Sequence, residues 1–186
     1  MKKPKLIIVV LVVTSLAIIF SKIIKQNAQA EGIYLSQNVY NYLETGSNQR
    51  AVYSRAIKLN QGSTANTCVY FMSEVLRENN IMLPMETSNT QQLIPLLTEK
   101  GFEKQRDYKK LRPGDICFTT DDNKGFPTHT YVFMKWVKEG NYDYAYICDN
   151  QAKDYKGKVY HIRNINVVTK ANGADKDAFS FFMRKG

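Results

Sequence analysis

A cysteine near residue 70 has the sequence surroundings of a catalytic nucleophile. Cys68 follows the loop-rich segment 61–67 and begins the segment 68–79, in which apolar residues recur at helical spacing. The start of a helix favours a thiolate, the nucleophilic form of cysteine, because unpaired backbone N–H groups and the helix dipole attract negative charge there. The same N–H groups can hold the oxyanion that forms when a thiolate attacks an amide carbonyl. Cys68 is therefore our predicted nucleophile, and the alternative is an inert cysteine buried in a helix.

A thiol nucleophile needs a base, and the chain has only two histidines. His129 follows the loop 121–128 and stands at the head of a predicted strand, where a strand end can open onto a cleft. His161 alternates with the residues of a late strand, so we expect it to face solvent or a neighbouring element. We predict that His129 is the base.

A third polar group is needed to orient the imidazole and to stabilise its protonated form. Asp149 ends the apolar segment 144–148, and an antiparallel neighbour would bring that end beside His129. Asn150 and Gln151 are the nearby substitutes. The alternative for Asp149 is ordinary turn chemistry, since an Asp-Asn pair after a strand is common in turns.

The order of predicted elements indicates the fold that positions these groups. Helical periodicity predicts two helices within 33–60 around a turn at 46–48, then helices over 68–79 and about 90–100. Alternation predicts five strands, at 116–119, 130–137, 142–148, 158–163 and 179–184. Helices followed by strands with Gly, Asn and Asp turns favour an α+β domain, with N-terminal helices packed on an antiparallel sheet of five to six strands.

The first thirty residues have the pattern of an export signal. Lysines flank an apolar run over 6–20, and Ala28-Gln29-Ala30 fits the small-x-small cleavage rule. Lys22 and Lys25 lie between the apolar run and this cleavage motif. If the segment is not cleaved, a helix over 6–24 is long enough to span a bilayer. We therefore divide the chain into 1–30, a signal peptide or membrane anchor, and 31–186, a domain that faces the outside, either secreted or anchored to the membrane.

Charge and cysteine spacing argue against nucleic acid binding and against a structural zinc site. The net charge is +9, but residues 1–30 hold five lysines and no acids, so the rest carries a scattered +4. This gives little support to nucleic acid binding. The three cysteines show no zinc-binding spacing, and the odd count leaves at least one thiol free. Cys117 and Cys148 are expected to be core residues, with a disulfide between them as the alternative.

Three motifs, in this order, resemble those of the CHAP and NlpC-type families of cysteine hydrolases. They are Asn66-Thr-Cys-Val-Tyr70, Leu111-Arg-Pro-Gly-Asp115 and His129-Thr-Tyr-Val-Phe133. The resemblance covers about residues 50–184 and implies a papain-like fold with a Cys68, His129 and Asp149 triad and no metal or cofactor. It also implies hydrolysis of amide bonds in peptidoglycan stem peptides or cross-bridges, a substrate that an exported domain would meet.

The chain departs from both families at specific positions. NlpC-type members usually have Asp-Cys-Ser and His-Val-Gly, whereas this chain has Asn66-Thr-Cys68 and His129-Thr-Tyr131. CHAP members often carry Glu-x-Asn where it has Asp149-Asn-Gln151, and they place an oxyanion-donating Gln beside the cysteine. Asn66 or Gln61 is our candidate for that donor. Asn66 and Gln151 are the predicted substrate-binding residues.

Two other functions remain compatible with these residues. A transglutaminase-like acyltransferase uses the same order of Cys, His and Asp, and it differs only in passing the acyl group to an amine. A membrane-tethered cell-wall binding module that has lost catalysis is the third alternative, and the departures around Cys68 and His129 favour it to some degree.

Overall fold

The computed structural model describes the backbone of residues 3–120 and 125–186, and the side chains of residue 14 and of residues 16–120 and 125–186. Part of the predicted loop 121–128, and the side chains of 6–13 and Ser15 in the predicted apolar run, lie outside the described residues. In the described part of the chain, no helix has the length and apolarity that crossing a membrane requires.

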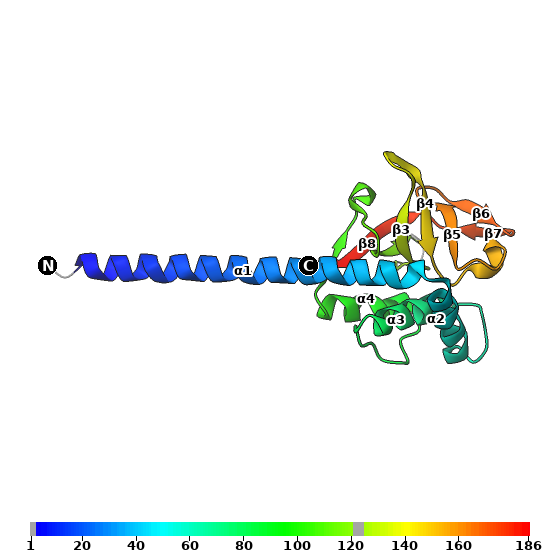
Figure 1. Ribbon diagram of the computed structural model, residues 1–186, viewed down its shortest axis with the longest axis horizontal. Coiled ribbons are helices and arrows are strands. Elements are labelled where there is room, and N and C mark those ends of the chain that lie inside the picture. The colour runs from blue at the N-terminus through cyan, green and yellow to red at the C-terminus, as the bar shows by residue number, and fades with distance from the viewer. Residues whose placement is uncertain (1–2, 121–124) are drawn as a thin grey trace.

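The described residues form an α+β fold with four α-helices, which come first, and an antiparallel sheet of six strands (Figure 1). The helices are α1 (Lys3–Glu44), α2 (Gly46–Leu59), α3 (Cys68–Glu78) and α4 (Thr90–Glu99). The strands of the sheet are β1 (Phe102–Gln105), β2 (Ile116–Thr119), β3 (Thr130–Lys138), β4 (Asn141–Cys148), β5 (Tyr160–Asn164) and β8 (Phe179–Lys185), and a separate hairpin comprises β6 (Thr169–Ala171) and β7 (Ala174–Lys176). This confirms the predicted α+β class, with N-terminal helices and an antiparallel sheet of five to six strands.

The strand order in the sheet is β1-β8-β2-β3-β4-β5, and every neighbouring pair is antiparallel. All five predicted strands are present, with ends within two residues of those expected. The sequence analysis missed β1, β6 and β7, because these strands are only three or four residues long and each has at most one buried residue, so they show no apolar alternation.

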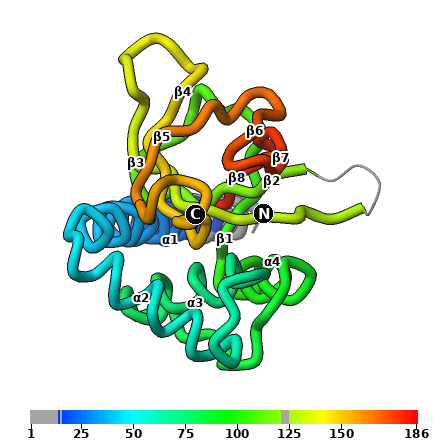
Figure 2. Tube along the Cα trace, turned by 90° about the vertical axis from the view of Figure 1, so that its right-hand side faces the viewer, coloured from blue at the N-terminus to red at the C-terminus, as the bar shows by residue number. Residues whose placement is uncertain are grey.

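Alternation along the strands gives the sheet two buried faces. One face packs on the helices and contributes Ile116, Phe118, Val132 and Met183, among others, to the main core. The opposite face forms a second cluster, which includes Cys117, Tyr131, Phe133, Ile147 and Phe182. Figure 2 shows α2, α3 and α4 gathered on one side of the strands, with α1 seen along its axis. The central strands are thus buried on both faces, which makes them a rigid support for side chains at their ends.

The first two helices meet at a sharper boundary than predicted. The expected turn at 46–48 is wrong, because α1 ends at Glu44 and Gly46 already begins α2. Side-chain amides donate hydrogen bonds to carbonyl groups at the end of α1, which have no partner within the helix. Asn48 Nδ2 donates to the Tyr42 carbonyl over 3.0 Å, and Gln49 Nε2 donates to the Leu43 carbonyl over 2.7 Å.

The Pro-Gly-Asp turn before β2 holds α1 and β8 together. The Asp115 carboxylate is buried and accepts hydrogen bonds from the Arg112 N–H at 2.7 Å and from Arg184 Nε at 2.7 Å. Gly114 has φ +89° and packs so closely on α1 that a Cβ atom there would lie 1.9 Å from the Ser36 carbonyl oxygen. The motif therefore has a structural role, which is to set where β2 starts.

Replacing Gly114 by alanine is expected to destabilise the fold, because a side chain is strained at this φ and would also displace α1. The matched control is Gly140→Ala, since Gly140 also has positive φ but nothing lies within 4 Å of the position a Cβ would take. We expect Gly114→Ala to lose about 1–3 kcal/mol more than the control in chemical denaturation. Equal losses would mean that α1 does not pack here in solution.

Candidate active site

His129 and Asp149 form the centre of the candidate site. Their strands are neighbours, and Val132 of β3 pairs with Cys148 of β4, so the head of β3 lies beside the end of β4. His129 Nε2 is 2.8 Å from Asp149 Oδ2, and both residues are buried. The other carboxylate oxygen, Oδ1, accepts the Gln151 N–H at 2.8 Å. The two residues predicted as base and orienting group are therefore in direct contact.

Cys68 is the first residue of α3, as the sequence predicts. Hydrogen bonds hold the loop that precedes it. Asn60 Nδ2 donates to the Ala65 carbonyl over 2.7 Å, and Asn66 takes the left-handed conformation with φ +56°. The next residue, Thr67, is fully buried, and its Oγ1 accepts a hydrogen bond from Asn150 Nδ2 at 2.8 Å. This contact ties the start of α3 to the residue that follows Asp149, so Cys68 is held near the His129–Asp149 pair.

The pKa values of the pair follow from its burial and contacts. Burial lowers the pKa of His129, but the hydrogen bonds and charges of Asp149 and Cys68 outweigh it and raise this pKa to about 9. Burial raises the pKa of Asp149, yet the hydrogen bond from His129 and the nearby histidines bring it below its ordinary value. Both directions favour an imidazolium next to a carboxylate at neutral pH. Because Nε2 is engaged by Asp149, Nδ1 is the nitrogen left for the Cys68 thiol.

Backbone N–H groups at the start of α3 have no partner within the helix. The helix's first backbone hydrogen bond runs from the Phe71 N–H to the Thr67 carbonyl at 2.8 Å, which leaves the N–H groups of Cys68 and the next two residues outside the helical ladder. Asn66 lies in the same pocket as Cys68, whereas Gln61 is exposed and does not line it. Of the two predicted oxyanion donors, only Asn66 is thus close to the nucleophile.

The pocket that contains Cys68 and His129 has a volume of about 230 Å³ and a predominantly polar lining. It is lined by Asn66, Cys68, Thr128, His129, Asn150, Gln151, Arg163, Asp175, Lys176 and Asp177. The sequence analysis missed the last four of these, which come from β5, from β7 and from the residue after β7. A larger pocket of about 670 Å³, between α1 and the β1–β8 edge, contains none of the predicted site residues.

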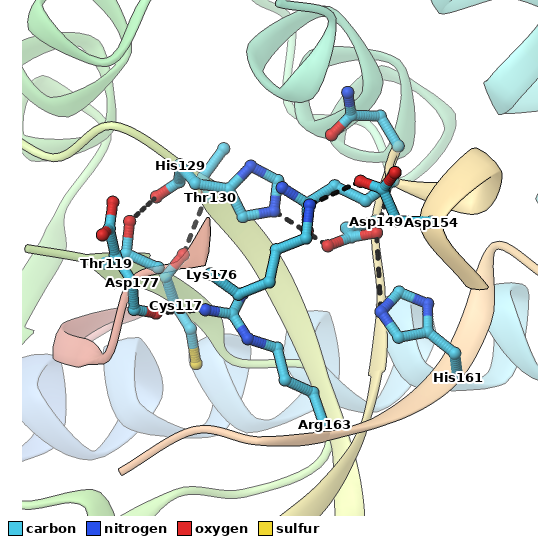
Figure 3. Close-up of polar contacts among 12 residues, drawn as sticks. Cys117, Thr119, His129, Thr130, Asp149, Asp154, His161, Arg163, Lys176 and Asp177 are labelled. Carbon is cyan, nitrogen blue, oxygen red and sulfur yellow. Dashed lines mark hydrogen bonds and ion pairs between the residues drawn. The ribbon is translucent and has the colours of Figure 1, made fainter. Parts of the chain in front are cut away.

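His161 is buried rather than facing solvent, which settles the two alternatives that alternation left open for it. It is 5% exposed and stacks on Tyr155 with ring centroids 3.5 Å apart. Its Nε2 is 3.9 Å from Asp149 Oδ1, so the aspartate lies between two imidazoles (Figure 3). Burial lowers the pKa of His161, although Asp149 opposes this, so His161 is the more readily neutral of the two histidines. Alternation could not show this in advance, because the apolar neighbour Ile162 is the residue that is exposed.

The three cysteines are all free. Cys117 on β2 and Cys148 on β4 are separated by β3 and belong to clusters on opposite faces of the sheet, so the alternative of a disulfide between them does not hold. Burial raises the pKa of both thiols well above its ordinary value. Cys68 is the cysteine with partial exposure, and the only one of the three that lines the pocket.

Across the residues that the structure describes, no group of three or more His, Cys, Asp or Glu side chains is arranged to hold a metal ion. Comparison of the chain with protein-family models, with curated proteins and with solved structures finds no match.

Proposed function

We propose that this protein is an exported, papain-like cysteine hydrolase that cleaves amide bonds in peptidoglycan peptides. One observation carries the proposal: a buried carboxylate holds His129 by one ring nitrogen at 2.8 Å, in a pocket that also contains a thiol at the start of a helix. A thiol, an imidazole and an orienting carboxylate together can perform acyl transfer. The helices-then-sheet architecture is consistent with a papain-like fold.

In the proposed reaction, His129 begins as an imidazolium, and Cys68 reacts as its thiolate. The thiolate attacks the amide carbonyl carbon, and the N–H groups at the start of α3, with Asn66, stabilise the resulting oxyanion. His129 then donates its proton to the leaving amine, which yields a thioester and a free amine. Water, deprotonated by His129, hydrolyses the thioester and regenerates the thiol. Asp149 holds the imidazole ring and stabilises its positive charge throughout.

The N-terminal segment and the motif order support the proposed location and substrate class. The basic flank and apolar run of 1–24 favour export, with cleavage and membrane anchoring both open. The motif order around Cys68, Asp115 and His129 resembles families that act on cell-wall peptides. An exported amidase with a polar pocket next to its nucleophile fits this substrate.

The direct test of the Cys68–His129 pair is the pH dependence of iodoacetamide labelling at Cys68. His129 has a pKa of about 9, so it stays protonated through neutral pH and places a positive charge beside the sulfur of Cys68 that attacks the reagent. We expect labelling at pH 6–7 to be about 10-fold or more faster than for a free thiol, and this advantage to fade as the pH rises through about 9. Mass spectrometry of the labelled peptide measures the rate.

The same profile measured with His129→Ala should lose the fast labelling at pH 6–7. His161→Ala is the matched control, because it removes the other histidine near Asp149 while leaving the contact between His129 and Asp149 in place. Cys68 labelling that follows an ordinary thiol near pKa 8.5 and ignores His129→Ala would reject the enzyme and favour the binding module.

A further inference from the structure

A buried arginine in the pocket lacks an acidic partner. Arg163 on β5 is 3% exposed, and its guanidinium lies 5.8 Å from the centre of the Tyr131 ring. One terminal nitrogen donates to the backbone carbonyl of Asp177, as Figure 3 shows, but Nε has no hydrogen-bond partner. Among the described residues Arg163 forms no ion pair with any carboxylate. Its charge is therefore buried with only part of its hydrogen-bonding capacity used.

Burying an unpaired guanidinium raises the free energy of the folded protein unless a ligand pairs with its charge. A buried charge without a counter-ion loses its hydration and gains little in return, so arginines at buried positions are normally paired. Because the unpartnered Nε belongs to a side chain that lines the same pocket as Cys68 and His129, an anion in that pocket is the partner in reach. The planar guanidinium matches a carboxylate, which it binds through two parallel hydrogen bonds.

The other charged side chains of the pocket each have a hydrogen-bond or ion-pair partner within the protein. Lys176 Nζ donates to Asp154, so its charge is compensated within the protein. The Asp177 carboxylate accepts a hydrogen bond from Thr128 Oγ1 at 2.6 Å, and Asp175 lies 3.8 Å from Lys170. Arg163 is thus the cation of this pocket that has no compensating carboxylate.

We propose that Arg163 binds a carboxylate of the substrate, so that the enzyme selects peptides with a free carboxylate on a residue flanking the scissile amide. This inference rests on the proposed hydrolase function, because it takes the pocket next to Cys68 as the substrate site. In a peptidoglycan stem, the α-carboxylate of a γ-linked glutamate is a group of this kind, and amidation to isoglutamine removes its charge.

The test separates binding from catalysis. Fluorescein-labelled L-Ala-γ-D-Glu-L-Lys-D-Ala and its isoglutamine counterpart are titrated, by fluorescence anisotropy, into protein carrying Cys68→Ala, which cannot cleave them. We expect the free-carboxylate peptide to bind about 10-fold or more tightly, because a charge-assisted pair to a buried arginine is lost in the amide. Adding Arg163→Gln should remove this difference, and Arg163→Lys should retain part of it.

Lys138→Gln is the matched control, since it removes one positive charge at an exposed position on β3 outside the pocket and should leave the difference intact. Equal binding of the two peptides, no binding of either, or a preference that survives Arg163→Gln would overturn the inference. A preference that depends on Arg163, combined with no cleavage of either peptide by the protein with Cys68 intact, would support the inference and reject the hydrolase.

Discussion

Replacing Cys68 by alanine is expected to abolish peptide hydrolysis while leaving the fold intact. In the proposed mechanism the Cys68 sulfur forms the bond to the substrate carbonyl carbon, and no second thiol lines the pocket. Removal of the nucleophile from such an acyl-transfer site costs on the order of 10⁴-fold or more in kcat. The loss is measured as release of new amino groups from a stem peptide, and thermal unfolding checks that the variant is folded.

The matched control is Cys117→Ala. Cys117 is a buried cysteine of β2 whose side chain belongs to the cluster on the sheet face opposite the helices, so its removal takes away a thiol without touching the pocket. It should retain turnover close to that of the parent protein. Substantial hydrolysis by the Cys68→Ala protein would show that the nucleophile is another group.

Replacing Asp149 by asparagine is expected to reduce kcat/KM by roughly 10²–10⁴-fold, because asparagine no longer stabilises the imidazolium and can favour the wrong tautomer of His129. Asp149 is also one of the groups that hold the pKa of His129 at about 9. Without its charge this pKa falls, so His129 loses its proton at a lower pH. The alkaline limit of the rate should therefore move to lower pH, which a pH profile of kcat/KM measures directly.

Asp143→Asn is the control for this variant, because Asp143 lies on the same strand but is exposed and distant from the pocket lining. Its profile should match that of the parent protein. A rate for Asp149→Asn within about twofold of the parent, with an unshifted alkaline limit, would show that the contact with His129 is structural only.

The sequence alone determined the parts of this protein that depend on local pattern. Apolar residues at helical spacing after Cys68 predicted α3 and placed the cysteine at its first turn, since periodicity and capping act over a few residues. Alternation predicted β3 and β4, and the chain has only two histidines. These two facts were enough to predict that His129 and Asp149 are partners. Their contact at 2.8 Å required only that the two strands be antiparallel neighbours.

The tertiary structure decided everything that depends on distant segments meeting. Arg163 looks in the sequence like one more basic residue of a late strand, and only its burial without a carboxylate partner gives it a role. The position of Lys176 depends on a hairpin too short and too exposed to be visible as a pattern. His161 could be read either way from alternation, because a strand pattern says which side chains share a face but not what covers that face. Covering elements come from elsewhere in the chain. Local residue order was therefore enough to propose a nucleophile and its base, whereas long-range packing determined the pocket around them.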